Sequence, residues 1–111
     1  MRQLIDQPLD ERPTAIFCGN DVLAIGAMLE AQHRGISIPD DLSIVEFDDL
    51  PMAEYLPPGL TTVHVPSKRM GAEAARYILN KAAGKPVEDR VQLSTNLVLR
   101  GTTAAPPKVL V

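Results

Sequence analysis

The order of apolar and polar positions in the first half of the chain predicts a strand, a helix and a second strand. Residues 14–18 (TAIFC) and 42–47 (LSIVEF) are short, mainly apolar runs of strand-forming residues. Residues 22–34, which lie between them, are rich in helix formers and too long a run for one strand. This succession is a βαβ unit, in which the two strands run parallel. We expect residues 14–18 to form a central strand that is covered on both faces.

The predicted helix at residues 22–34 is apolar on nearly every side. Asn20 or Asp21 is expected as its N-cap, and Gly35 as the residue that follows its C-terminal end. Its apolar residues are Val22, Leu23, Ala24, Ile25, Ala27, Met28 and Leu29. A helix that is apolar on most faces needs two partners. We expect the sheet to be one of them and a second subunit to be the other.

After the second strand, the pattern predicts an irregular stretch, one more strand and one more helix. The prolines within residues 48–59 exclude a regular helix there, and residues 60–65 (LTTVHV) alternate as a strand does. Ser67 is expected to cap a helix at residues 68–83, which ends at Gly84.

The predicted helix at residues 68–83 has a single apolar stripe at helical spacing. Its members are Met70, Ala74, Tyr77 and Ile78. We expect these 111 residues by themselves to expose the stripe, and therefore to dimerise, swap or aggregate. Residues 91–93 and 97–100 are further strand candidates, and the chain from residue 101 onward is expected to be a frayed terminus.

Composition and charge narrow the class of protein. An apolar fraction of 45% with 23% charged residues is typical of one globular domain. A net charge of −3, with scattered basic residues, argues against direct contact with the phosphates of nucleic acid. We find no apolar run long enough to span a membrane and no secretory signal, so we expect a cytoplasmic protein. The lone cysteine, Cys18, lies in an apolar run and is expected to be a buried thiol.

Polar side chains follow both strands of the predicted βαβ unit. Asn20 and Asp21 follow the first strand, and Asp48 and Asp49 follow the second. Because the carboxyl ends of parallel strands meet at one edge of a sheet, we expect all four to lie at that edge, where ligands bind. Carboxylate and amide groups suit the hydroxyl groups of a sugar or a nucleoside.

Other roles remain open for these residues. Asp21 has the usual chemistry of a helix cap, and Asp48 with Asp49 would suit a divalent cation if Glu46 or Glu54 supplied a third oxygen ligand. His33 and His64 have no serine or cysteine partner at a known motif spacing. We therefore expect neither catalysis nor a cofactor, and no resident metal.

Five segments in order resemble the C-terminal half of the effector-binding region of LacI/GalR-type transcriptional repressors. They are PTAIFCGND, GISIPDDLSIVEFDDLP, YLPPGLTTVHVP, MGAEAARYIL and LVLRGTT, and the resemblance spans residues 12–103. It implies an incomplete α/β fold, one parallel-sheet lobe of a periplasmic-binding-protein-like (type I) core. It also implies that residues 13–103 are the effector-binding portion. Residues 1–12 are polar, contain Pro8 and end before Pro13, so we expect a linker or the remnant of a preceding element there, and residues 104–111 are expected to be a flexible tail.

The resemblance also implies roles for individual residues. Asn20 and Asp48 would contact a sugar-like or nucleoside-like effector, with Asp21 and Asp49 beside them. A homodimer would form through the helix and the following loop, and the residues expected at its interface are Leu23, Ala27 and Tyr55. Operator DNA would be bound only by a helix-turn-helix segment that these residues do not contain, and the first lobe of the core is absent as well.

Glu46 is where the sequence departs from the family pattern, which usually has a small residue at this position. A carboxylate at the end of an apolar strand must reach solvent or find a partner, because an unpaired buried charge is costly. We therefore expect either a different effector or an altered pocket. Two alternative functions remain, namely a sugar-binding lobe of a transport-linked protein and a small divalent-cation-dependent enzyme that uses Asp48 and Asp49.

Overall fold

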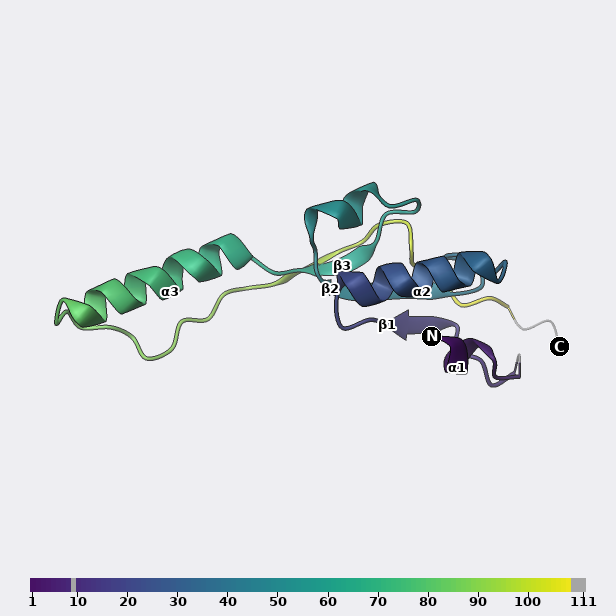
Figure 1. Ribbon diagram of the computed structural model, residues 1–111, viewed down its shortest axis with the longest axis horizontal. Helices are drawn as coiled ribbons and strands as arrows, with labels where there is room; N and C mark the ends of the chain where they lie inside the picture. The colour runs from purple at the N-terminus through teal and green to yellow at the C-terminus, as the bar shows by residue number, and fades with distance from the viewer. Residues whose placement is uncertain (9, 109–111) are drawn as a thin grey trace. The chain divides into compact units, whose positions relative to one another are not determined.

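The computed structural model describes residues 1–8 and 10–108 of the chain (Figure 1). Its elements in order are α1 (Arg2–Ile5), β1 (Ala15–Phe17), α2 (Asp21–His33), β2 (Ser43–Asp48), the 3-10 helix η1 (Pro51–Tyr55), β3 (Thr61–His64), α3 (Ser67–Ala82) and β4 (Asn96–Val98). They fall into two compact units. The sheet unit comprises Met1–His64 and Leu97–Val111, and the α3 unit comprises Val65–Asn96. None of the described helices is both long and apolar enough to cross a bilayer.

The strands confirm the predicted βαβ unit and its parallel sheet. The strand order is β1-β2-β3-β4, and both β1 with β2 and β2 with β3 pair in parallel. The prediction of a central first strand covered on both faces is wrong. In the described chain β1 lies at the edge of the sheet, because it pairs only with β2. Phe17 is 64% exposed, so the described residues leave its face of the strand largely uncovered.

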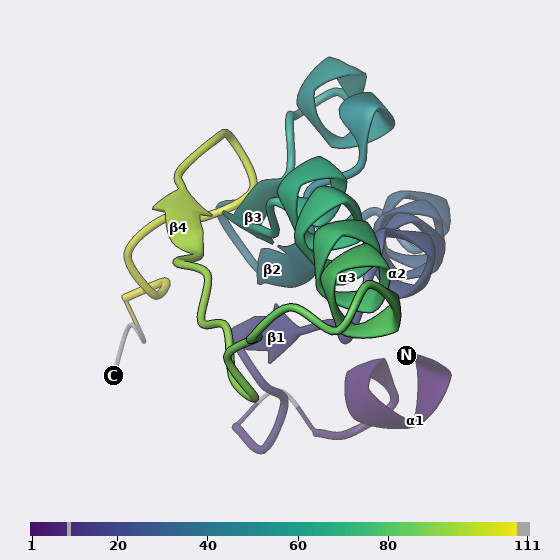
Figure 2. The same ribbon diagram turned by 90° about the vertical axis from the view of Figure 1, so that its left-hand side faces the viewer.

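Helix α2 packs against β2 through its small residues (Figures 1 and 2). Ala24, Ala27 and Ala31 are buried, while Leu23 and Leu29 are mostly exposed. These three alanines recur at helical spacing, so they form one face that lets the helix approach the sheet closely. Asn20 is the N-cap, and after the C-cap Arg34 comes Gly35 with φ +69, as expected of a left-handed residue there.

The core of the sheet unit lies between α2 and one face of the sheet. Its buried members are Cys18, Ala24, Ala27, Leu42, Ile44, Ala53 and Leu60. Ala53 belongs to η1, a short 3-10 helix within the stretch that we expected to be irregular. Pro51 is compatible with this helix because it stands at the start, where a backbone N–H would have no helical partner.

The N-terminal residues are attached to the sheet unit. Ile5 in α1 is buried, and Arg34 forms an ion pair with Asp6 and a second one with Glu30. The boundary at residue 12 between a linker and the domain stays a prediction.

The segment at residues 101–104 is anchored to β2 and β3, so the expectation of a frayed terminus from residue 101 is wrong there. Thr102 is fully buried, and its Oγ1 donates to the carbonyl oxygen of Ile44 at 2.7 Å and accepts from the Thr61 N–H at 2.9 Å. Ser43 Oγ accepts from the Ala104 N–H at 3.1 Å. The side-chain hydroxyls of Thr102 and Ser43 thus form hydrogen bonds of the kind that backbone groups form between paired strands. Residues 109–111 of the predicted tail lie outside the described residues.

The α3 unit, in contrast, buries no residue of its helix. Ser67 is the first helical residue rather than its cap, since the N-cap is Pro66 and no side chain caps the helix. Gly84 follows the helix with φ +68, as predicted. No strand forms at residues 91–93, and the strand expected at 97–100 is observed in part, as β4 at Asn96–Val98. The predicted exposure of the apolar stripe is confirmed for Met70, at 49%, for Ala74 and for Ile78, at 64%, whereas Tyr77 is half-buried. Self-association stays a prediction.

Candidate functional site

The loops that follow β1 and β2 are joined by a hydrogen bond at the carboxyl edge of the sheet. Asp21, at the start of α2, accepts the backbone N–H of Leu50 through its Oδ1 at 3.1 Å. Leu50 directly follows Asp48 and Asp49. The bond therefore brings the two predicted polar pairs to the same edge, as the order of strands required.

Asn20 has a structural role and also remains available for a ligand. Its Oδ1 accepts the N–H of Leu23 at 3.0 Å, which makes it the N-cap of α2. The residue is exposed at the strand end. Capping uses the oxygen of the amide, so its nitrogen retains two donors for another partner.

Asp48 and Asp49 differ in their surroundings although they are adjacent. Both have left-handed backbone dihedrals, with φ 115 for Asp48 and φ 59 for Asp49, a conformation that non-glycine residues seldom adopt. Asp48 is exposed, and its side chain has no hydrogen bond or ion pair within the described residues. A carboxylate on a strained backbone with free acceptors is typical of a ligand-binding position.

Asp49 is held by two basic side chains. Its carboxylate lies 2.9 Å from His64 Nδ1 and 2.8 Å from Arg100 Nη2, and the Asp49 side chain is only 12% exposed. Arg100 also donates through Nη1 to the carbonyl oxygen of Leu60 at 2.9 Å. Asp49 thus fixes the loop after β2 to β3 and to the chain that follows β4.

Sequence reasoning missed the contact of Asp49 with His64 and Arg100. The parallel register pairs Asp48 with His64, so a correct alignment of the second and third strands would have pointed to it. The position of Arg100 depends on the anchored segment that follows it. No local sequence pattern predicts that this segment is anchored to the sheet.

Four buried oxygen atoms gather beneath this edge without a hydrogen-bond partner. They are Oδ2 of Asp21, both carboxyl oxygens of Glu46 and Oγ1 of Thr62. Burial is the main cause that raises the pKa of Glu46, the neighbouring Thr62 hydroxyl lowers it, and the carboxylates of Asp21 and Asp49 raise it again. The Glu46 side chain is fully buried. Glu46 therefore does not reach solvent, although the sequence left that outcome open.

In the part of the chain that the structure describes, no three His, Cys, Asp or Glu side chains are grouped so as to hold a metal ion. Cys18 is buried as predicted, and burial raises the pKa of its thiol, which disfavours the nucleophilic thiolate.

The three residues expected at a dimer interface have very different exposures. Leu23 is 59% exposed and Tyr55 is 80% exposed, so both present apolar surface. Ala27 is only 5% exposed and packs in the core, so it has almost no surface to offer a partner. The Ala27 side chain faces the sheet because it belongs to the alanine face of α2, which packs against β2.

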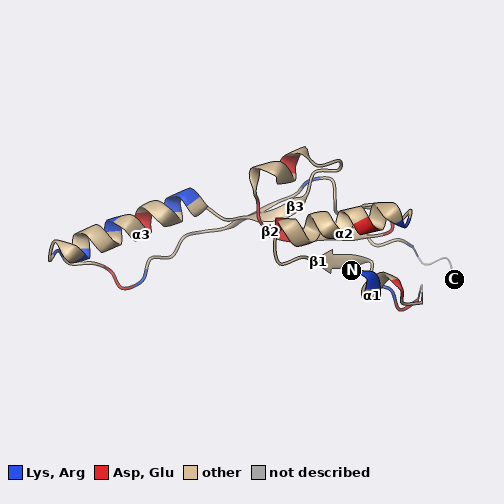
Figure 3. Ribbon diagram, in the orientation of Figure 1, with Lys and Arg blue, Asp and Glu red and all other residues tan. Residues whose placement is uncertain are grey.

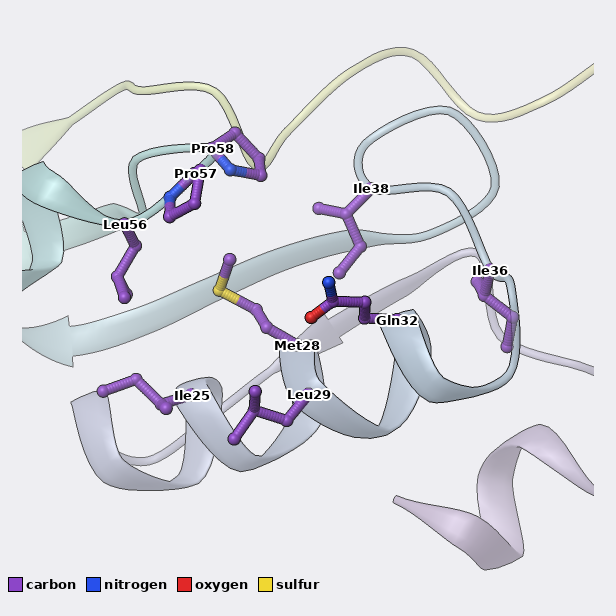
Figure 4. A pocket seen from close by; sticks show the side chains of 9 residues that line it. All are labelled: Ile25, Met28, Leu29, Gln32, Ile36, Ile38, Leu56, Pro57 and Pro58. Carbon is purple, nitrogen blue, oxygen red and sulfur yellow. The ribbon is translucent and has the colours of Figure 1, made fainter.

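An apolar pocket lies between α2, the segment that follows it and the loop at residues 56–58 (Figure 4). Its volume is about 370 Å³, and its lining residues are Ile25, Met28, Leu29, Gln32, Ile36, Ile38, Leu56, Pro57 and Pro58. Gln32 is the single side chain among them that can form hydrogen bonds. Such a wall suits the side chains of a partner protein better than a sugar.

Comparison with known proteins places these features in a family. A family model described as a periplasmic binding protein-like domain matches residues 1–103. The HTH-type transcriptional repressor PurR of Vibrio parahaemolyticus is 41% identical over 95 residues, which cover 85% of this chain and 28% of that repressor. The HTH-type transcriptional repressor CytR of Escherichia coli is 39% identical over 108 residues, which cover 96% of this chain and 31% of that repressor.

A solved structure agrees with these relatives. The LacI family transcriptional regulator from Lactobacillus casei with bound glucose is similar with a TM-score of 0.75 at 33% sequence identity, covering 92% of this chain and 36% of that one. The chain thus spans about a third of the length of the proteins it matches. The matches confirm the resemblance seen in the sequence, and with it the expected α/β lobe of an incomplete periplasmic-binding-protein-like fold.

Proposed function

The chain belongs to the periplasmic binding protein-like domain family, and from that premise we propose that it is an effector-sensing part of a LacI-type transcriptional regulator. The observation that carries the proposal is the edge of the sheet, where the loops after β1 and β2 are joined by the bond from Leu50 N–H to Asp21. This bond holds Asn20 and Asp48 at one edge with unused donors and acceptors. The named relatives, which are transcriptional repressors, support the same reading.

We propose that the effector is a small molecule with several hydroxyl groups, a sugar or a nucleoside. The free carboxylate of Asp48 accepts two hydroxyl donors, and the amide nitrogen of Asn20 donates to a hydroxyl or ring oxygen. Asp49 is occupied by His64 and Arg100, so its role is to hold the loop. Asp21 likewise positions the loop through Leu50.

Effector binding would act on transcription by a shift between two arrangements of the regulator. A ligand shifts such an equilibrium only through its different affinities for the two states. We assign operator binding to a segment outside these 111 residues, because their net charge is −3 and their basic residues are scattered. A sensor of this kind acts in the cytoplasm and catalyses no reaction.

We propose a homodimer formed through the outer face of α2 and the loop near Tyr55. Leu23 and Leu29 are about 60% exposed, and the pocket beside Leu29 is mainly apolar. Apolar surface of this extent on a helix is typical of an interface. The buried Ala27 is left out of it. In sedimentation experiments the wild type is expected to form a larger species than Leu23→Asp, and equal sedimentation would contradict the proposal.

The geometry also bears on the alternatives. A sugar-binding lobe of a transport protein would use the same edge, and the relatives favour the repressor over it. The cation-dependent enzyme would need Asp49 free for the ion, whereas that carboxylate is already paired with Arg100 at 2.8 Å. We therefore prefer a binding function over a catalytic one.

Ligand titration tests the proposed site. The chain is titrated with glucose, adenosine, cytidine and hypoxanthine, and binding is followed by saturation-transfer NMR. We expect a signal for at least one of them in the wild type and a loss of about tenfold or more in affinity in Asp48→Asn, since a hydrogen bond to a charged group contributes about 1.5–3 kcal/mol.

The matched control is Asp10→Asn. Asp10 is exposed and precedes β1, so it lies toward the opposite end of the strand and is expected to leave binding unchanged. Equal affinities of the wild type and Asp48→Asn would show that the ligand binds elsewhere. Binding that requires Mg²⁺ and is lost in Asp48→Asn would support the cation-dependent alternative instead.

A further inference from the structure

The group of unpartnered oxygens under the ligand edge needs a physical explanation. Glu46 and Thr62 are direct neighbours across the β2–β3 register, and Asp21 lies beside Glu46 at the start of α2. All three residues are fully buried. Leaving a buried polar group without a partner costs about 1–3 kcal/mol, and more if the group is charged. Four unpartnered oxygens in one place therefore indicate that a shared proton or a cation joins them.

No basic side chain accounts for the charge. The groups that face Glu46 are Asp21 from α2, Thr62 from β3, Asp49 from the loop after β2, and Cys18 at the end of β1. Each is either acidic or uncharged. The basic partners of Asp49 are used by its own carboxylate. The N-terminal ammonium of Met1 lowers the pKa of Cys18, but it is not among the groups that shift the pKa of Glu46.

We propose that Glu46 and Asp21 share one proton, and that Glu46 is thereby a positioning residue for the ligand edge. Protonated Glu46 donates its O–H to Oδ2 of Asp21, and the Thr62 hydroxyl donates to the other oxygen of Glu46. One proton therefore gives every one of the four buried oxygens a partner. Like-charged carboxyl groups in contact commonly share a proton in this way, because both cannot ionise at low cost.

The shared proton has a consequence for the effector site. Oδ1 of Asp21 accepts the N–H of Leu50, next to Asp49 and Asp48. If Glu46 ionises, it repels Asp21 and must leave the core, so the bond that holds the loop weakens. Ionisation of Glu46 and the position of Asp48 are therefore linked.

The sign of the pH dependence follows from the direction of the pKa shift. The pKa of Glu46 is raised in the folded chain from an ordinary value of 4.5, chiefly by burial. Between the unfolded and the folded pKa the native state holds more protons than the unfolded state. Its stability is therefore fully present below the unfolded pKa and is lost as pH rises toward the folded pKa.

Comparison of the full chain with Glu46→Gln tests the proposal. Glutamine replaces the shared proton permanently, since its amide donates to Asp21 and accepts from Thr62. Urea unfolding is measured from pH 5 to pH 8, because the stability from the shared proton is expected to be lost as pH rises above the ordinary pKa of a glutamate. As pH rises, we expect the unfolding constant of the wild type to increase by up to about tenfold per pH unit relative to Glu46→Gln. Glu11→Gln, at an exposed carboxyl, is expected to follow the wild type.

Two further measurements separate a proton from a merely well-packed side chain. Hydrogen exchange of the Leu50 amide reports the loop, and its protection factor is expected to fall with pH in the wild type but not in Glu46→Gln. Infrared spectra recorded over the same pH range are expected to contain a protonated carboxyl band that Glu46→Gln lacks. Parallel unfolding curves at all pH values, or the absence of that band, would overturn the proposal.

Asp21→Asn is a second variant in case Glu46→Gln does not fold. Its amide oxygen can accept from Leu50, and its nitrogen can donate to ionised Glu46, so the shared proton is no longer needed. The pH dependence of unfolding is expected to weaken in Asp21→Asn as well. Specific stabilisation of the wild type by Na⁺, Mg²⁺ or Ca²⁺ at constant ionic strength, absent in Glu46→Gln, would show that a cation rather than a proton joins these oxygens.

Discussion

Helix α2 in the sheet unit and helix α3 in the α3 unit differ in whether their small and apolar residues are buried. In α2, apolar side chains lie on most sides, yet the helix is well packed because its alanine face meets β2. In α3, the apolar stripe is well separated from the charged residues, which are spread along the helix in Figure 3. No residue of α3 is buried.

This difference shows that an amphipathic sequence pattern predicts a helix but does not predict that the apolar face of that helix is buried. An apolar stripe needs a complementary surface, and most of the stability of a helix in a protein comes from that surface. Within the α3 unit, a cavity of about 470 Å³ lies between the stripe and residues that include Val91 and Leu93. The segment opposite the stripe therefore covers it incompletely.

Two matched isoleucine variants give the largest expected difference between the units. Ile44 is fully buried in β2, whereas Ile78 in α3 is 64% exposed. Ile44→Ala is expected to lower the free energy of unfolding by about 2–5 kcal/mol, since it removes buried methyl groups and leaves a cavity. Ile78→Ala is expected to change it by less than about 0.5 kcal/mol. Urea denaturation followed by circular dichroism measures both.

A milder variant is available if Ile44→Ala does not fold. Ile44→Val removes a single methyl group and is expected to cost about 0.5–1.5 kcal/mol. Equal losses for the variants at positions 44 and 78 would show that α3 is buried in solution, for example in a self-associated form. The contrast between the two units would then hold only for a single chain.

The segment at residues 101–104 gives the next largest effect, because it shows how far the sheet unit extends. Thr102→Val removes the buried hydroxyl that accepts from the Thr61 N–H at 2.9 Å and donates to the carbonyl oxygen of Ile44 at 2.7 Å. The buried N–H is left unpaired, which is expected to cost about 1–3 kcal/mol. Thr14→Val, at an exposed position, is the control and is expected to stay within about 0.5 kcal/mol of the wild type in the same assay. A loss equal to that of the control would mean that this segment is frayed after all.

Much of the sheet unit could be predicted from the sequence because its signals are local. The apolar runs before Gly19 and Asp48, the capping chemistry of Asn20 and the left-handed Gly35 each depend on neighbours in the chain. The parallel sheet follows from their order. The edge that carries Asn20 and Asp48 is a consequence of that order as well.

The remaining features depend on contacts between distant residues, so no local pattern reveals them. Thr102 is anchored by Ile44 and Thr61, which precede it by 58 and 41 residues. The exposed edge position of β1 depends on which strands are present to pair with it. Likewise, Asp49 could be singled out as polar from its sequence position, but its partner Arg100 is set by the fold. The roles of Asn20 and Asp48 toward an effector stay predictions.

The smallest expected effect compares the first turns of the two helices. Asn20→Ala removes the Oδ1 that accepts from Leu23 N–H at 3.0 Å, so the free energy of unfolding is expected to fall by about 1 kcal/mol. Ser67→Ala is expected to change it by less than about 0.5 kcal/mol, because Ser67 does not cap α3. Denaturation in urea, followed by circular dichroism, distinguishes the two. Similar losses would indicate that Ser67 caps α3 in solution, contrary to the structure.

A third variant separates the two roles of Asn20. Aspartate is as good an N-cap as asparagine, so Asn20→Asp is expected to unfold at the same urea concentration as the wild type. It has no amide nitrogen, however, and therefore loses the donors that we assign to the effector. A loss of ligand binding without a loss of stability in Asn20→Asp would locate that contact at the edge of the sheet. If binding persists in Asn20→Asp but fails in Asn20→Ala, the residue serves the site only by capping α2.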